Sequence, residues 1–178
     1  MTALIVPDPD RFEEWRALIE DSGDEVPHGS GMWWVEAGST REGFEQHLAT
    51  SALNADTNVT PPEGRVHCTQ WWITDDEDRL LGFLQLRHEL NDFLREKGGN
   101  IGYSIRESRR REGHATRALG LALDAAHALG IERALVTCDD TNVASARTIE
   151  AQGGVMEDIR DGTRRYWVAT SGSPLPRP

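Results

Sequence analysis

Apolar residues recur three or four positions apart in several segments of the chain, which is the spacing of an amphipathic helix. The clearest case follows Ala115 and runs to Leu129, where Gly130 supplies a stop. Two more helices are predicted in the first third of the chain, from about Arg11 to Asp21 and from Ser39 to about Leu53. Each begins at an Asp or Ser followed three residues later by Glu, which is the pattern of a capping box.

Shorter runs alternate or stay apolar, and these predict strands. The predicted strands are Val66–Thr74, Leu80–His88, Ile101–Ile105, Ala134–Cys138, Val155–Ile159 and Arg165–Ala169. The acidic turn 75–78 and the pair Asp161-Gly162 each join two consecutive strands as a hairpin. A helix after Cys138 is expected to be capped by Thr141 or Asn142 and to end at Gly153-Gly154.

Length and composition fit a single soluble domain. The chain has 178 residues, 38% of them hydrophobic, so we expect one domain over residues 1–170 and a disordered tail over residues 171–178. No apolar run reaches the length of a membrane span and no signal peptide is apparent, so a cytoplasmic protein without a membrane partner is expected. Cys68 and Cys138 lie in strand-like runs, which favours buried reduced thiols over a disulfide.

Acidic residues outnumber basic ones by 30 to 19, giving a formal charge of −11. This charge argues against a nucleic-acid partner and favours a cationic substrate, although an acidic surface that only maintains solubility remains an alternative. Against this background, four arginines cluster just after the strand Ile101–Ile105, at positions 106, 109, 110 and 111. Their position at a turn between a strand and a helix favours a cofactor phosphate over DNA.

The turn from Arg110 to Ala115 opens directly into the long helix. Free backbone N–H groups and the helix dipole therefore converge on one place, which suits a phosphate. Gly113 and Ala115 let the backbone come close to an anion, and the arginines add charge-assisted hydrogen bonds. The sequence thus predicts a site for a phosphorylated cofactor.

This turn resembles the pyrophosphate loop of the GNAT superfamily of acetyl-CoA-dependent N-acetyltransferases, Arg/Gln-x-x-Gly-x-Gly/Ala, through Arg110, Gly113 and Ala115. The resemblance extends from about residue 66 to residue 168 and includes Asn142, which matches an asparagine that commonly faces the cofactor. It implies an α/β (α+β) GNAT-like acyl-CoA N-acyltransferase fold, with a mixed, mostly antiparallel sheet of about seven strands and about four helices. It also implies acetyl-CoA as cosubstrate, no metal, and acetyl transfer to an amine in a ternary complex.

The resemblance assigns the cofactor site to the end of the strand Ile101–Ile105, to the turn, and to the start of the later helix. The expected cofactor-binding residues are Ser104, Ile105, Arg110, Arg111, Glu112, Gly113, His114, Ala115, Thr116, Asn142 and Ser145. In this family the cofactor strand is distorted, and Gly102 is a candidate for a β-bulge, although close packing explains a strand glycine equally well.

The family's usual proton-transfer residues are absent here. The common glutamate corresponds to Gly99 or Asn100, and the common tyrosine corresponds to Ile149. The remaining catalytic candidates are His88 and Glu89 as bases and Tyr103 as a donor. A purely structural role for His88 and proton removal through water both remain open.

Other features leave the acceptor undetermined. The pairs Trp33-Trp34 and Trp71-Trp72 could bind a cationic amine or simply pack, and His67-Cys68 has no partner pair that would complete a metal site. We expect a small cationic amine such as a polyamine, an amino sugar or an amine antibiotic. A protein acceptor, a non-catalytic acyl-CoA-binding sensor and a homodimer are the alternatives that stay open.

Overall fold

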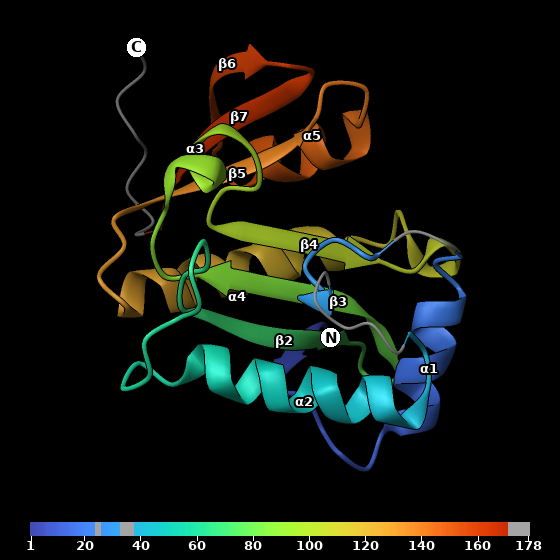
Figure 1. The fold of residues 1–178 in the computed structure, drawn as a ribbon. Helices are drawn as coiled ribbons and strands as arrows, with labels where there is room; N and C mark the ends of the chain where they lie inside the picture. The colour runs from blue at the N-terminus through green and yellow to red at the C-terminus, as the bar shows by residue number, and fades with distance from the viewer. Residues whose placement is uncertain (24–25, 33–37, 171–178) are drawn as a thin grey trace.

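The computed structural model describes residues 1–23, 26–32 and 38–170. Seven strands of this part of the chain form one mixed sheet in the order β1-β2-β3-β4-β5-β7-β6, in which only β4 and β5 are parallel (Figure 1). The strands are β1 (Ala3–Ile5), β2 (Cys68–Thr74), β3 (Leu80–Arg87), β4 (Ile101–Ile105), β5 (Arg133–Asp139), β6 (Val155–Arg160) and β7 (Thr163–Ala169). The α-helices are α1 (Phe12–Glu20), α2 (Arg41–Ala55), α3 (Asp92–Glu96), α4 (His114–Ala128) and α5 (Val143–Ala151). The α/β fold expected from the sequence is confirmed, and α3 is the helix beyond the expected four.

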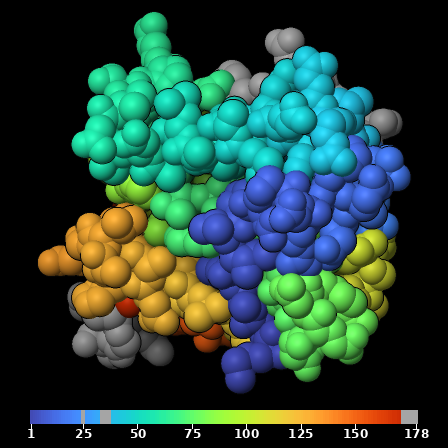
Figure 2. All heavy atoms as spheres, turned by 90° about the horizontal axis from the view of Figure 1, so that it is seen from below, coloured from blue at the N-terminus to red at the C-terminus, as the bar shows by residue number. Residues whose placement is uncertain are grey.

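Helices cover both faces of the sheet. On one face, α1 and α2 lie side by side (Figure 2) and bury an aromatic cluster that contains Trp15, Phe44, Trp72 and Phe83. On the other face, α4 and α5 pack on the apolar side of β3, β4 and β5, with Leu119 and other small and branched residues. Trp72 is 0% exposed, so it belongs to the core and does not line a ligand site.

The local signals in the second half of the chain are confirmed. β4 has the bounds expected from the sequence, and α4 ends before Gly130, whose φ of +79° is the left-handed conformation typical of a helix stop. Asn142 caps α5 by accepting a hydrogen bond from the N–H of Ser145 at 3.0 Å. Cys68 and Cys138 are both buried free thiols.

Both predicted capping boxes are wrong. α1 begins after Arg11 without a side-chain cap, and the N–H of Asp10, which Glu13 would bind in a capping box, instead donates to the carboxylate of Asp8. In α2 the cap is Thr40, not Ser39, and its hydroxyl accepts from the N–H of Gly43 at 3.1 Å.

Two short elements escaped the sequence pattern. β1 has only three residues and gains its order by pairing with β2, and α3 has only five residues. The pair Trp33-Trp34 and the expected tail over residues 171–178 lie outside the described residues. None of the helices in the described ranges has the length and apolar character needed to cross a membrane.

β4 and β5 meet at one end and separate beyond it. The two strands pair only between Ile101 and Val136. Just before this pair, the carboxamide of Asn100 donates to the carbonyl of Arg87 at 3.1 Å and accepts from the N–H of Leu135 at 2.9 Å. Asn100 therefore ties β3 to β5, and no strand of the described ranges pairs with the edge of β4 after Ile101.

Candidate active site

The turn between β4 and α4 presents a row of free backbone donors. The N–H groups of residues 111–116 donate to no acceptor within the described residues, whereas the N–H of Arg117 already bonds the carbonyl of Gly113 at 3.1 Å. Arg111 and Gly113 have φ values of +65° and +81°, which curl the turn around this row. Such a concave set of N–H groups at the start of a helix is suited to a phosphate.

Side chains hold the turn in this shape. Arg109 donates to the carboxylate of Asp75 at 2.9 Å and to that of Glu112 at 3.0 Å. The ring Nδ1 of His114, a residue that is 7% exposed, lies 2.9 Å from the hydroxyl of Thr2. The turn is thus fastened to the β2–β3 hairpin and to the start of the chain, while its backbone donors stay open.

Asp75 is the most strongly stabilised anion near the turn. Burial by itself raises the pKa of this carboxyl, but hydrogen bonds from Arg79 and Arg109 outweigh burial and hold the pKa well below its ordinary value. Arg111, by contrast, is exposed and forms no hydrogen bond or ion pair within the described ranges. It is the arginine of the turn that remains available to a ligand.

Several predicted cofactor residues come together beside this turn. Ser104, Ile105 and Arg110 line a cleft of about 310 Å³ between the end of α1 and the end of β4. Arg110 is oriented by donating its Nε–H to the carbonyl of Ile105 at 2.9 Å. His28 lines the same cleft.

Tyr103 reaches from β4 to α5 across the separation between β4 and β5. Its hydroxyl lies 2.9 Å from that of Ser145, in the first turn of α5. Burial raises the pKa of Tyr103 to about 12, and the hydrogen bond to Ser145 offsets part of this rise. The phenol is therefore neutral near pH 7 and can donate a hydrogen bond, but it is a weaker acid than a thiol with its pKa near 8.5.

The predicted base candidates lie elsewhere. His88 follows the end of β3, four residues beyond Leu84, the cross-strand partner of Tyr103, which is about 13 Å along the sheet. Its Nε2 is 2.8 Å from the hydroxyl of Thr69, and burial lowers its pKa. Glu89 is exposed. The structure therefore does not bring His88 and Glu89 together with Tyr103.

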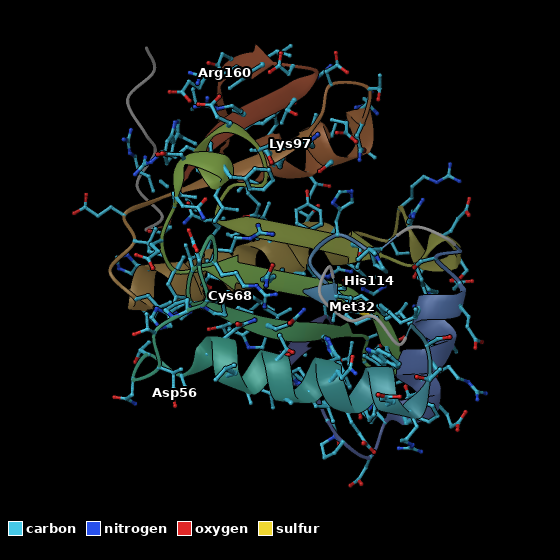
Figure 3. All side chains as sticks on the ribbon, viewed as in Figure 1. Met32, Asp56, Cys68, Lys97, His114 and Arg160 are labelled. Atoms are coloured by element: carbon cyan, nitrogen blue, oxygen red, sulfur yellow. The ribbon has the colours of Figure 1, made fainter. Side chains whose placement is uncertain are left out.

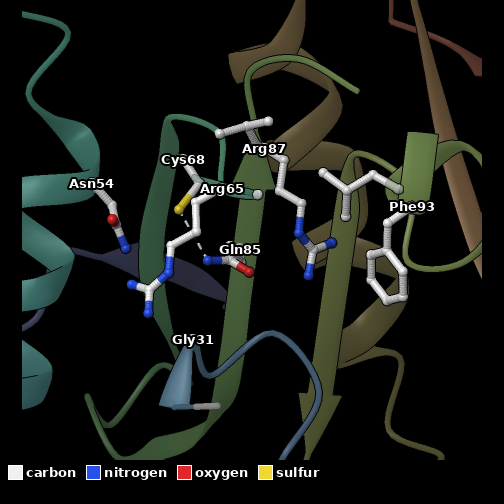
Figure 4. A pocket seen from close by; sticks show the side chains of 10 residues that line it. Gly31, Asn54, Arg65, Cys68, Gln85, Arg87 and Phe93 are labelled. Carbon is white, nitrogen blue, oxygen red and sulfur yellow. Dashed lines mark hydrogen bonds between the residues drawn. The ribbon is translucent and has the colours of Figure 1, made fainter. Parts of the chain in front are cut away.

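A second hollow lies at the opposite end of β3 and β4 from the turn, as the positions of Cys68 and His114 in Figure 3 show. We call this cavity of about 490 Å³ the α2–β3 pocket. Its polar and aromatic lining residues are Asn54, Arg65, Cys68, Gln85, Arg87 and Phe93. Gln85 and Arg87 project from the strands, with Asn54 on one side and Phe93 on the other (Figure 4).

A tight loop forms one wall of the α2–β3 pocket and crosses β4. Gln70, buried in β2, accepts from Ser51 of α2 at 2.9 Å and donates to the carbonyl of Gly29 at 3.2 Å. A side chain at Gly29 would approach the carbonyl oxygen of Gly102 to 2.3 Å. β3 and β4 stay in continuous register through Gly102, so the candidate bulge is absent. A Cβ at Gly102 would meet its nearest atoms at 3.5–3.6 Å, so close packing requires the glycine at position 29 and not the one at 102.

Sequence patterns missed Arg87 as a site residue. It stands on the same face of β3 as Phe83 and Gln85, so its charge points into the interior side of an otherwise buried strand. An arginine at an inward-facing position of a buried strand was the sequence feature that could have identified Arg87 as a site residue.

Comparisons with known proteins agree with this architecture. A family model described as an acetyltransferase (GNAT) domain matches residues 11–155. The ribosomal-protein-S5-alanine acetyltransferase from Vibrio fischeri shares 16% identity over 96% of this chain and 92% of that one, with a TM-score of 0.68.

Two further solved structures resemble the chain. The RimL ribosomal L7/L12 α-N-protein acetyltransferase in complex with coenzyme A has 16% identity, a TM-score of 0.67, and coverage of 97% of this chain and 96% of that one. A chimera of spermidine N-acetyltransferase SpeG from Vibrio cholerae and hSSAT has 16% identity and a TM-score of 0.61, with 96% of each chain covered. No curated protein matches the chain in sequence.

Proposed function

Because the chain belongs to the GNAT acetyltransferase family, it is an acetyl-CoA-dependent N-acetyltransferase, and we propose that it acetylates the primary amine of a small acceptor by direct attack. The observation that carries this proposal is the row of free N–H groups at residues 111–116, placed beside a strand edge that has no partner. Together these features provide an anion site and an adjoining channel of unpaired backbone groups.

The residues present fit acetyl-CoA. We assign the pyrophosphate to the N–H groups of residues 111–116 and to the side chains of Arg110 and Arg111, and the pantetheine arm to the strand edge at Tyr103 and Ile105 and to the cleft at Ser104. Asn142 and Ser145 at the start of α5 form the other side of the opening. When bound, acetyl-CoA supplies the thioester that the amine attacks.

The chain itself supplies position and hydrogen bonds. The backbone N–H and C=O groups of successive residues in an antiparallel strand point in opposite directions. Asn100 and Arg106 bond to β3, so the N–H and C=O groups of Tyr103 point away from β3, toward the gap between β4 and β5. We propose that this N–H and the neutral phenol stabilise the negative charge that develops during transfer. The pKa of Tyr103 suits a hydrogen-bond donor better than a source of protons.

We propose that the amine loses its proton to water and not to His88. His88 lies about 13 Å along the sheet from the level of Tyr103, and its ring is already hydrogen-bonded to the hydroxyl of Thr69. Asn100, at the family's base position, is occupied in bridging β3 and β5. A His88→Ala variant should therefore keep most of its turnover, and a complete loss with intact folding would restore His88 as the base.

The acceptor side of the proposal rests on the α2–β3 pocket. Its volume of about 490 Å³ suits a small molecule, and it lies next to the start of β4. We place the complete activity in one domain of residues 1–170.

Calorimetric binding of acetyl-CoA tests the cofactor site. Wild type should bind in the micromolar range, and Gly113→Glu should abolish binding, because it adds a carboxylate beside the free N–H groups. Gly113→Ala is the matched control: it carries the same strain at a φ of +81° but no charge, so it should bind measurably. Absence of binding to folded wild type would refute the proposal, and binding without turnover of any amine would favour an acyl-CoA sensor.

A further inference from the structure

The α2–β3 pocket has a charge opposite to that of the whole chain. Two arginines, Arg65 and Arg87, line it, and the described lining contains no Asp or Glu. The formal charge of −11 had favoured a cationic acceptor, but an acceptor experiences the charges of its own pocket most strongly. A polyamine in this pocket would place its ammonium groups beside fixed cations.

Arg87 is the central charge of the pocket. Its Nη1 donates to the carbonyls of Gly98 and Gly99, each at 3.1 Å, and within the described residues the guanidinium forms no ion pair. Burial lowers the pKa of Arg87, yet an arginine remains protonated in proteins. A half-buried cation with only carbonyl partners leaves a positive charge that an anionic ligand can compensate.

The same side chain lies next to the strand that holds the thioester in the proposed function. Its Nη1 is 3.6 Å from the position that a Cβ at Gly102 would occupy. An anion bound to Arg87 is therefore held beside the first half of β4. An amine one or two bonds away from that anion can reach the unpaired edge of the strand.

The remaining walls are mostly apolar. Phe93, which is 67% exposed, and Leu94 form one side, and Val66 contributes to another. These surfaces suit an uncharged side chain, while the amides of Gln85 and Asn54 can accept or donate hydrogen bonds.

We propose that the acceptor is an amino-acid-like molecule with an uncharged side chain, whose carboxylate binds Arg87 and whose amine receives the acetyl group at β4. This inference rests on the proposed function and narrows its acceptor to amines that carry a carboxylate. Arg87 is thereby a specificity-determining residue for the acceptor.

The test compares pairs of acceptors that differ only in the carboxylate. Thiol release from acetyl-CoA is measured with L-methionine, L-leucine and L-phenylalanine, with the amide of each, and with spermidine. Wild type should have a kcat/KM for the acids about 10- to 100-fold above that for the amides, as expected for charge-assisted hydrogen bonds. Equal or faster turnover of the amides or of spermidine would overturn the proposal.

Variants then assign the effect to Arg87. Arg87→Gln should lose the preference for acids through a higher KM while its affinity for acetyl-CoA stays unchanged, and Arg87→Lys should keep part of it. Arg95→Gln, an exposed arginine of α3 outside the pocket lining, is the matched control and should behave as wild type. An equal loss for acids and amides in Arg87→Gln would mean a structural role and would also overturn the proposal.

Two outcomes separate this inference from the proposed function. If wild type binds acetyl-CoA and acetylates amides or spermidine better than acids, only the acceptor inference fails. If wild type binds no acetyl-CoA or acetylates no amine, both fail.

Discussion

We predict that adding one methyl group at Gly29, in the variant Gly29→Ala, disrupts the close contact between this loop and β4. A Cβ at Gly29 would lie 2.3 Å from the carbonyl oxygen of Gly102 and 2.9 Å from the Cα of Tyr103. Both are backbone atoms of the strand on which acetyl transfer is proposed, so no flexible side chain can move aside. In Gly29→Ala, either the loop moves away from the sheet or the backbone of β4 is distorted.

The magnitude follows from two separable costs. Alanine at a φ of +75° costs about 1–2 kcal/mol, and overpacking against fixed atoms adds about 1–3 kcal/mol. Gly130→Ala carries only the first cost, because its φ is +79° and nothing lies within 4 Å of the added Cβ. We therefore expect Gly29→Ala to lower the free energy of unfolding by about 2–5 kcal/mol and Gly130→Ala by about 1–2 kcal/mol.

Urea denaturation of the two variants and wild type measures this difference, and thiol release measures its functional consequence. If the loop rises instead of straining β4, the stability of Gly29→Ala will approach that of the control, but turnover will fall because the pocket wall has moved. Matching values for both unfolding and turnover in Gly29→Ala and Gly130→Ala would refute the close contact between loop and strand.

Three other substitutions probe the turn, the core and α5. Asp75→Asn should weaken acetyl-CoA binding about 10-fold in calorimetry, because Arg109 loses its charged anchor and the turn loosens; unchanged affinity would contradict this reasoning. Burial lowers the pKa of His47 to about 4, whereas an unfolded histidine titrates near 6.5, so the unfolded chain binds the extra proton and stability should fall by about 2 kcal/mol between pH 7 and pH 5. His47→Phe should remove that fall in urea titrations at the two pH values, and an identical pH dependence would show that other groups cause it. Asn142→Ala should cost about 1 kcal/mol through loss of the cap at Ser145, measured by thermal unfolding, and no change would mean that the cap is replaced by water.

The sequence predicted best the parts of the molecule that depend on neighbouring residues. The glycine and arginines of the turn at residues 110–115 and the cap at Asn142 act within a few positions of themselves, so their patterns are readable in one dimension. The cap at Asp10 failed because several acidic side chains lie close together: residues 8–14 contain four of them, and Asp8 accepts the hydrogen bond from the N–H of Asp10. β1 could not be predicted because three residues carry too little pattern without their partner strand.

The catalytic candidates show a different limit. Alternation along β3 places His88 on the face of Leu84 and Leu86, in agreement with its bond to Thr69, but it does not reveal which face the acceptor approaches. That depends on the loop at Gly29 and on α2, which lie far from β3 in the sequence and which Gln70 joins by hydrogen bonds. The inward cation at Arg87 became interpretable only once those segments enclosed a cavity around it.

The two halves of the site are built in ways that should let them vary independently. The phosphate-facing half is a single continuous segment from β4 to α4, and its ligating groups are mostly backbone N–H donors, which few substitutions alter. The α2–β3 pocket is assembled from residues of five separate segments, and its character comes from side chains such as Arg87 and Phe93. A side chain there can be exchanged without moving the turn, because the fastening of the turn to Asp75 and Thr2 lies at the other end of the strands. Changes of acceptor should therefore require only a few pocket substitutions, whereas a change of cosubstrate would require a new backbone path between β4 and α4.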